Sequence, residues 1–199
     1  LDNKGIEARL RLNLINDRQH DLSWNVTLSA AHEENKIRKL SNAMKAMNQE
    51  AMDLENNKGG SEVFRMYEVG RSQTALMLVR SMGIDPSTGN EVYIKRNGAL
   101  TFEYDPNDKV EVGNTNPKLQ GYVNSNLTWK GLNLYMHFGY EMGAKRFNQT
   151  LATKVEGADP TKNADRRVLY DRWKKPGDKV MFRRIDDQTP VYQSTRLVQ

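Results

Sequence analysis

The sequence contains no cysteine and no long hydrophobic run. Because none of its 199 residues carries a thiol, disulfide bonds and thiolate metal sites are excluded. No stretch approaches the roughly 18 consecutive apolar residues that identify a membrane-spanning helix. A membrane β-barrel stays open as an interpretation, because its strands are half polar and their average hydropathy resembles that of a soluble protein.

A catalytic or metal-binding motif is also missing from the sequence. The histidines are far apart, and no H-E-x-x-H, G-x-S-x-G or phosphate-binding loop occurs. Asp105, Asn107 and Asp108 lie close together in the chain, but the glycine and the distal glutamate of a calcium loop are lacking. We therefore predict that the protein is not an enzyme, with no catalytic residues, no metal site and no cofactor.

The net charge of +5 does not by itself indicate a nucleic-acid partner. The 30 basic residues are scattered among 25 acidic ones, and no run of five or more Lys or Arg is present. In residues 163–184, for example, aspartates interrupt the basic side chains. This mixture is typical of a solvated surface, so we predict no nucleic-acid binding.

Two stretches near the N-terminus alternate between apolar and polar residues. Residues 6–14 and 22–30 both place their apolar side chains at even positions, which is the period of a β-strand. An antiparallel pairing of Leu14 with Leu22 would place both apolar sets on one face. We therefore predict a hairpin with one apolar and one polar face, closed by a turn at about residues 15–21.

A second hairpin is predicted over residues 121–142. The apolar positions are odd before Lys130-Gly131 and even after it. A two-residue turn at this dipeptide keeps all of them on one face, because the change of parity matches the pairing across the turn. The predicted partners are Trp129 with Leu132, Leu127 with Leu134, and Ser125 with Met136.

The apolar face of these strands is suited either to a protein core or to lipid. The strand after the turn has about eleven residues, and would rise about 26 Å along a barrel axis at a tilt of about 45°. Trp129 and Tyr140 lie near its two ends, where aromatic girdles of a membrane barrel occur. Strands of a soluble sandwich average only five or six residues. A membrane barrel is the favoured interpretation, and a soluble β-sandwich is the alternative.

A long connection of about residues 31–120 separates the two hairpins. Within it, helix formers predict a short surface helix over residues 41–55, ended by Gly59-Gly60. Asn97-Gly98 predicts a tight turn between two short strands. The apolar face expected for the helix consists of Met44, Met47, Ala51 and Leu54.

Several short segments, in this order, resemble the late barrel portion of SusC/RagA-type TonB-dependent outer-membrane transporters of Bacteroidetes. They are Asn3-Lys4-Gly5, Gly83-Ile84-Asp85-Pro86 with Thr88-Gly89, Gly113-Asn114-Thr115-Asn116-Pro117 with Gly121, and Arg172-Trp173 with Lys175-Pro176-Gly177-Asp178. Each segment is weakly specific alone, and the ordered set covers nearly the whole chain apart from the Met-rich helix.

The resemblance implies an all-β fold that forms part of a large antiparallel transmembrane barrel. In such transporters the barrel has 22 strands around a plug and carries long extracellular loops. The whole chain, residues 1–199, would belong to the C-terminal part of this barrel, and the connection of about 31–120 would be extracellular. We expect an internal piece of a longer protein, because the sequence contains no plug, no TonB box and no closing strands.

The same resemblance implies a function and a set of partners. The parent protein would import oligosaccharides or peptides across the outer membrane, beneath a SusD-like lipoprotein lid and with energy from TonB. Its other partners would be outer-membrane lipid and a second SusC–SusD pair, giving a dimer of pairs. The alternative is a soluble or surface-attached β-sandwich module that binds glycans.

The polar face of the predicted strands supplies the candidate cargo-binding residues. If this face lines a barrel lumen, its side chains contact cargo, or they hydrogen-bond to each other and to the plug. The candidates are Arg9, Arg11, Asn124, Asn126, Tyr135, His137 and Glu141, with Glu7 beside them. Aromatic residues of the long connection could stack on sugar, although packing within the loop is favoured: Phe64, Tyr67, Tyr93, Phe102 and Tyr104.

Overall fold

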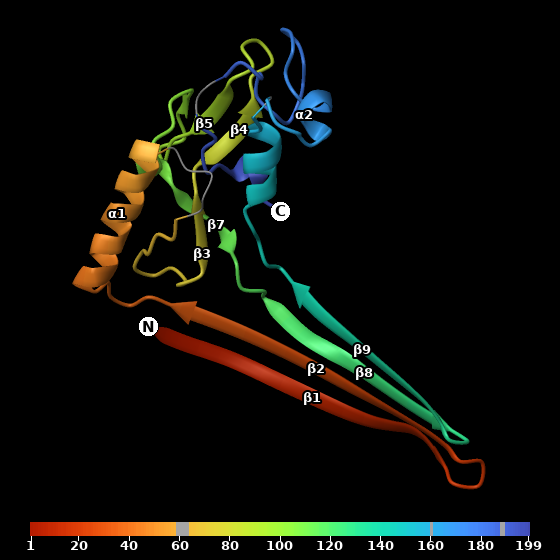
Figure 1. Ribbon diagram of the computed structural model, residues 1–199. Helices are drawn as coiled ribbons and strands as arrows, with labels where there is room; N and C mark the ends of the chain where they lie inside the picture. The colour runs from red at the N-terminus through yellow and green to blue at the C-terminus, as the bar shows by residue number, and fades with distance from the viewer. Residues whose placement is uncertain (59–63, 160, 188–189) are drawn as a thin grey trace.

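The computed structural model describes residues 1–58, 64–159, 161–187 and 190–199 of the chain. The chain is mostly β, with a few short helices, in agreement with the predicted all-β class. Figure 1 shows two parts, a long sheet and a more compact unit at one end of it. We call this second unit the head; it consists of residues 37–118 and 143–199, apart from the residues outside the described ranges.

The long sheet contains four antiparallel strands in the order β1-β2-β8-β9. Both hairpin turns lie at the end of the sheet that points away from the head (Figure 1). The sheet is open, with β1 and β9 as its edges, so these residues alone do not close a barrel. The strands are β1 (Asp2–Asp17), β2 (Leu22–Lys36), β8 (Leu119–Trp129) and β9 (Leu132–Met142).

The first hairpin forms as predicted, but its register differs from the predicted one. Leu22 pairs with Asp17, and a bulge between Asn13 and Ile15 absorbs one residue, so the predicted pairing of Leu14 with Leu22 is wrong. The turn is shorter than predicted because the Asp17 carboxylate accepts hydrogen bonds from the backbone N–H groups at residues 19 and 20. Beyond the bulge, the apolar residues of both strands still share one face.

The second hairpin has the predicted register. Trp129 pairs with Leu132, and the pairing continues residue by residue, without a bulge, to Leu119 and Met142. The φ angles of Lys130 and Gly131 are 45° and 83°. Positive φ at both central residues is the requirement of a type I′ turn, which explains the tight two-residue loop.

The head contains two small sheets, one of β3 with β7 and one in the order β4-β5-β6. The predicted hairpin around Asn97-Gly98 corresponds to β5 and β6. The connection between the long strands is shorter than predicted, since β2 extends to Lys36 and β8 begins at Leu119. The strands are β3 (Ala75–Leu78), β4 (Arg80–Ile84), β5 (Glu91–Ile94), β6 (Leu100–Thr101) and β7 (Val110–Asn114).

Helix α1 (Asn42–Lys58) is the predicted helix, but part of its predicted inner face is wrong. Met47 is 52% exposed, whereas Glu55 is buried. Polar contacts join the helix to the rest of the head: Asn48 exchanges two hydrogen bonds with the backbone of Tyr67, at 2.7 and 2.8 Å. The predicted end of the helix, Gly59-Gly60, lies outside the described residues.

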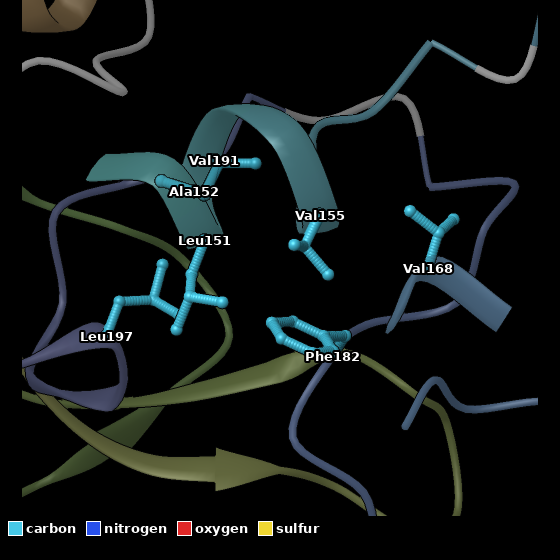
Figure 2. Close-up of a cluster of buried hydrophobic side chains, with 7 residues drawn as sticks. All are labelled: Leu151, Ala152, Val155, Val168, Phe182, Val191 and Leu197. Carbon is cyan, nitrogen blue, oxygen red and sulfur yellow. The ribbon is translucent and has the colours of Figure 1, made fainter. Parts of the chain in front are cut away.

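The main hydrophobic core of the head forms among the last fifty residues of the chain. Short helices supply most of it: the π-helix η2 (Leu151–Glu156), α2 (Arg167–Tyr170) and the 3₁₀ turn η3 (Thr195–Leu197). A further 3₁₀ turn, η1 (Pro106–Asp108), precedes β7. Figure 2 shows the converging side chains, which are Leu151, Ala152, Val155, Val168, Phe182, Val191 and Leu197.

No helix in the described part of the chain is long and apolar enough to cross a membrane.

Candidate functional site: the two faces of the long sheet

The sequence-predicted site residues all lie on one face of the long sheet. Strand register aligns them in rows that cross the strands. One row contains Arg11, Thr27, Asn124 and His137, and the next contains Asn13, Asn25, Asn126 and Tyr135. Arg9 is in line with Ser29, Tyr122 and Gly139, and Glu7 with Ala31, Gln120 and Glu141.

Contacts between these side chains are local and leave most of the face open. The Asn124 side-chain oxygen contacts the His137 ring nitrogen. The His137 ring stacks on Tyr122 at 5.5 Å between centroids, and the Arg9 guanidinium lies 5.9 Å from the Tyr122 ring. Of the seven candidates only Asn124 is half-buried; the other six are exposed. The face therefore offers hydrogen-bonding groups and mixed charge over a broad surface.

The opposite face of the long sheet is apolar and uncovered. Leu10, Leu28, Val123 and Phe138 form one row across all four strands. Phe138 is 61% exposed and Leu10 52% exposed, and no second layer covers the face within the described part of the chain. Burying such a face in a core would stabilise the fold by about 25 cal/mol for each Å² of apolar area removed from water. An exposed apolar face of this size indicates an apolar partner, and the described residues do not cover it.

Three polar side chains on the apolar face, those of Trp24, Ser125 and Tyr140, are hydrogen-bonded within the sheet. The Trp24 indole N–H donates to the Ser125 hydroxyl at 2.9 Å, and the Tyr140 hydroxyl donates to the Ser29 carbonyl at 2.8 Å. Gly121 makes the second contact possible, because a Cβ there would lie 2.0 Å from the Ser29 carbonyl oxygen. Unsatisfied polar groups are costly in hydrocarbon, so this pairing suits a lipid-facing surface.

The aromatic residues of the head are mostly part of its packing. Tyr93 is buried, and its ring meets Tyr104 edge-on at 5.4 Å. Tyr104 stacks on Tyr192 at 4.2 Å, and its hydroxyl donates to Glu55. The stacking partner Tyr192 is not among the aromatic residues that the sequence pattern singles out. Phe102 differs from these residues, because it is 56% exposed.

A buried network of ion pairs joins distant segments of the head, and no sequence pattern indicates it. Arg196 donates to Glu91 at 2.7 Å and to Glu156 at 2.8 Å. Arg183 donates to the same Glu156 at 2.8 Å and to Asp187 at 3.0 Å. These residues come from β5, η2 and the C-terminal segment, so the network fixes how these three parts pack.

The ion pairs shift the acid–base properties of the buried groups. Burial alone would raise the pKa of the Glu91 carboxyl, but the Arg196 guanidinium and the Ser194 hydroxyl outweigh it and hold that pKa below its usual range. Burial raises the pKa of the Tyr93 and Tyr104 hydroxyls well above their ordinary value. At neutral pH the Glu91–Arg196 pair is therefore charged, and Tyr93 and Tyr104 are neutral.

The described residues contain no group of three or more His, Asp or Glu side chains placed to hold a metal ion. The long sheet offers hydrogen bonding, ion pairing and ring stacking on one face, and apolar contact on the other.

Comparison with known proteins gives a structural likeness only. No protein-family model matches the chain, and no curated protein matches it. A solved structure of the RagAB peptide transporter superimposes with a TM-score of 0.71 at 16% identity, over 99% of this chain and 21% of that chain. A structure of the RagAB peptide importer in its 'open-open' state superimposes with a TM-score of 0.70 at 17% identity, over 99% of this chain and 20% of that chain. The chain therefore has the fold of about one fifth of a RagAB transporter chain.

Proposed function

We propose that the chain is part of the barrel of an outer-membrane importer of the SusC/RagA kind. In this assignment the long sheet spans the membrane, its apolar face contacts lipid, and its polar face lines the interior. The β1 and β9 edges pair with further strands of the same barrel, since open sheet edges do not occur in hydrocarbon. The head then lies outside the cell.

The uncovered apolar face is the observation that carries this proposal. It extends over four strands of 11 to 16 residues, and the Trp24, Ser125 and Tyr140 side chains on it are hydrogen-bonded within the sheet. Trp129 lies beside the turn and Tyr140 near the head, positions that suit the two membrane interfaces. The likeness to RagAB over nearly the whole chain supports the same arrangement.

The partners and the cargo follow from the resemblance and belong to the complete protein. We infer a SusD-like lipoprotein over the extracellular mouth, TonB acting on an N-terminal region, and association into a dimer of pairs. Peptides are the first cargo class to test, because the similar structures are of a peptide transporter. Oligosaccharides are the second, since both classes are consistent with the polar face described above.

Introducing a charge on the apolar face tests the membrane assignment. Met136 lies near the middle of this face, so Met136→Arg should destabilise the assembled barrel by about 2–4 kcal/mol, as expected for Arg near the bilayer midplane. Asn25→Arg is the matched control, because Asn25 is in an adjacent row on the polar face. Assembly of the complete protein is measured by its resistance to detergent unfolding. Equal assembly of both variants would contradict the proposal.

The β-sandwich alternative is less consistent with this structure. A sandwich requires a second sheet packed about 10 Å from the apolar face. Within the described ranges no such sheet is present, and Phe138, Leu134 and Leu10 stay exposed. A water-soluble, monomeric complete protein would restore this alternative.

A further inference from the structure

A pocket of about 380 Å³ opens on the head beside β5 and β6. It is distinct from the polar face of the long sheet, where the cargo-binding candidates lie. Tyr93 comes from β5, Phe102, Glu103 and Tyr104 follow β6, and Tyr192 comes from the C-terminal segment. We call it the aromatic pocket.

The rings of the aromatic pocket are held in place before any ligand binds. Tyr104 is fixed on three sides, by the edge of Tyr93, by the stacked ring of Tyr192 and by its hydrogen bond to Glu55. Phe102 takes part in none of these ring pairs, and its side chain is exposed at the mouth. The pocket thus has a rigid aromatic wall and one ring available to a ligand.

The charges lining the aromatic pocket leave a negative surplus at its mouth. Glu91 is paired with Arg196, and Arg183 and Asp187 are paired with each other. Glu103 is exposed, next to Phe102, and forms no ion pair among the described residues. Phe102 and Glu103 therefore supply an exposed ring and an exposed carboxylate to the lining of the same pocket.

We propose that the aromatic pocket binds the cationic side chain of a Lys or Arg residue of a peptide. Such a group gains from the face of an aromatic ring and from a charge-assisted hydrogen bond to a carboxylate. Its aliphatic stem contacts the Phe102 ring while its charge stays near Glu103. A neutral sugar ring would stack on Phe102 but would leave the negative charge of Glu103 without an opposite charge. This inference rests on the proposed function, because it requires that the head meets cargo.

The test compares two N-acetylated fluorescent peptides that differ only in Lys or norleucine at one position. Both are titrated against the complete protein, its Glu103→Gln and Phe102→Leu variants, and the control Glu50→Gln on the exposed side of α1. We expect wild-type protein to prefer the Lys peptide, and each pocket variant to weaken that peptide's binding by about two- to fivefold. The preference should diminish as salt is raised, and Glu50→Gln should leave it unchanged.

Other outcomes separate this inference from the proposed function. If both peptides bind wild-type protein equally, the cationic pocket is wrong while a peptide importer remains supported. If Phe102→Leu weakens a labelled oligosaccharide instead, the pocket takes sugar and the inference is also overturned. If a correctly assembled wild-type protein binds neither peptides nor oligosaccharide, the inference and the proposed function fail together.

Discussion

At the scale of single residues, the polar side chains of Ser125 and Glu91 have hydrogen-bonding partners in their apolar or buried surroundings. Ser125 is the polar exception within the apolar side of β8, and Trp24 on the neighbouring strand donates to it. Glu91 is buried in the head and is matched by Arg196 and Ser194. In each case the partner lies about one hundred residues away in the chain. The strand alternation identifies Ser125 as a polar exception, but no sequence pattern identifies Glu91 or any of these partners.

Removing one member of the buried network should destabilise the head in a pH-dependent way. Glu91→Gln leaves a buried guanidinium less well compensated, and we expect a loss of about 3–5 kcal/mol at neutral pH. The pKa of Glu91 is lowered in the folded state, so its contribution is complete above the unfolded pKa and is lost as pH falls through the folded pKa. The difference between variant and wild type should therefore shrink in acid.

Hydrogen exchange of the amides in η2 measures this effect within the complete protein. The matched control is Glu50→Gln, which removes an exposed carboxylate from α1. A Glu91→Gln protein with unchanged protection at pH 7, or with a loss that grows on acidification, would show that Glu91 does not stabilise the head as a carboxylate paired with Arg196.

At the level of elements, regular patterns were predictable and irregular ones were not. The long strands and the register of the second hairpin follow from an alternation of two residues, confirmed by the pairing. The register of the first hairpin was mispredicted because hydrogen bonds to the Asp17 carboxylate shorten its turn. The alternation of apolar and polar residues does not encode these hydrogen bonds. The α1 face was mispredicted because its contact with the head includes buried Glu55. The core around η2 was missed because its short segments have no periodic pattern.

The turn between β8 and β9 offers a test of how the hairpin is specified. Gly131 has a φ of 83°, and a Cβ added at this position would meet nothing within 4 Å, so a substitution there is opposed by backbone strain alone. Gly131→Ala should destabilise the protein by about 1–2 kcal/mol. Gly139→Ala, in β9 with equally open surroundings and no positive φ, should be neutral. Thermal unfolding of both variants is the measurement, and equal midpoints would contradict the turn assignment.

At the scale of the whole molecule, an elongated sheet carries the head at one end (Figure 1). The open edges β1 and β9 and the uncovered apolar face are what a segment of a larger barrel requires. The similar RagAB chains are about five times longer than the part matched here. The sequence pattern was sufficient to indicate the two-faced sheet, whereas the candidate cargo residues remain a prediction, because cargo contacts depend on chain segments beyond this sheet.

The environment of β9 tests the central claim most directly. Because the chain has no cysteine, single cysteines can be introduced at positions 132–139 and spin-labelled in the complete protein reconstituted into bilayers. If the apolar face meets lipid, collision with oxygen should be high at Leu132, Leu134, Met136 and Phe138 and low at the odd positions between them. Low accessibility to oxygen at those four even positions, as in a protein core, would contradict the account.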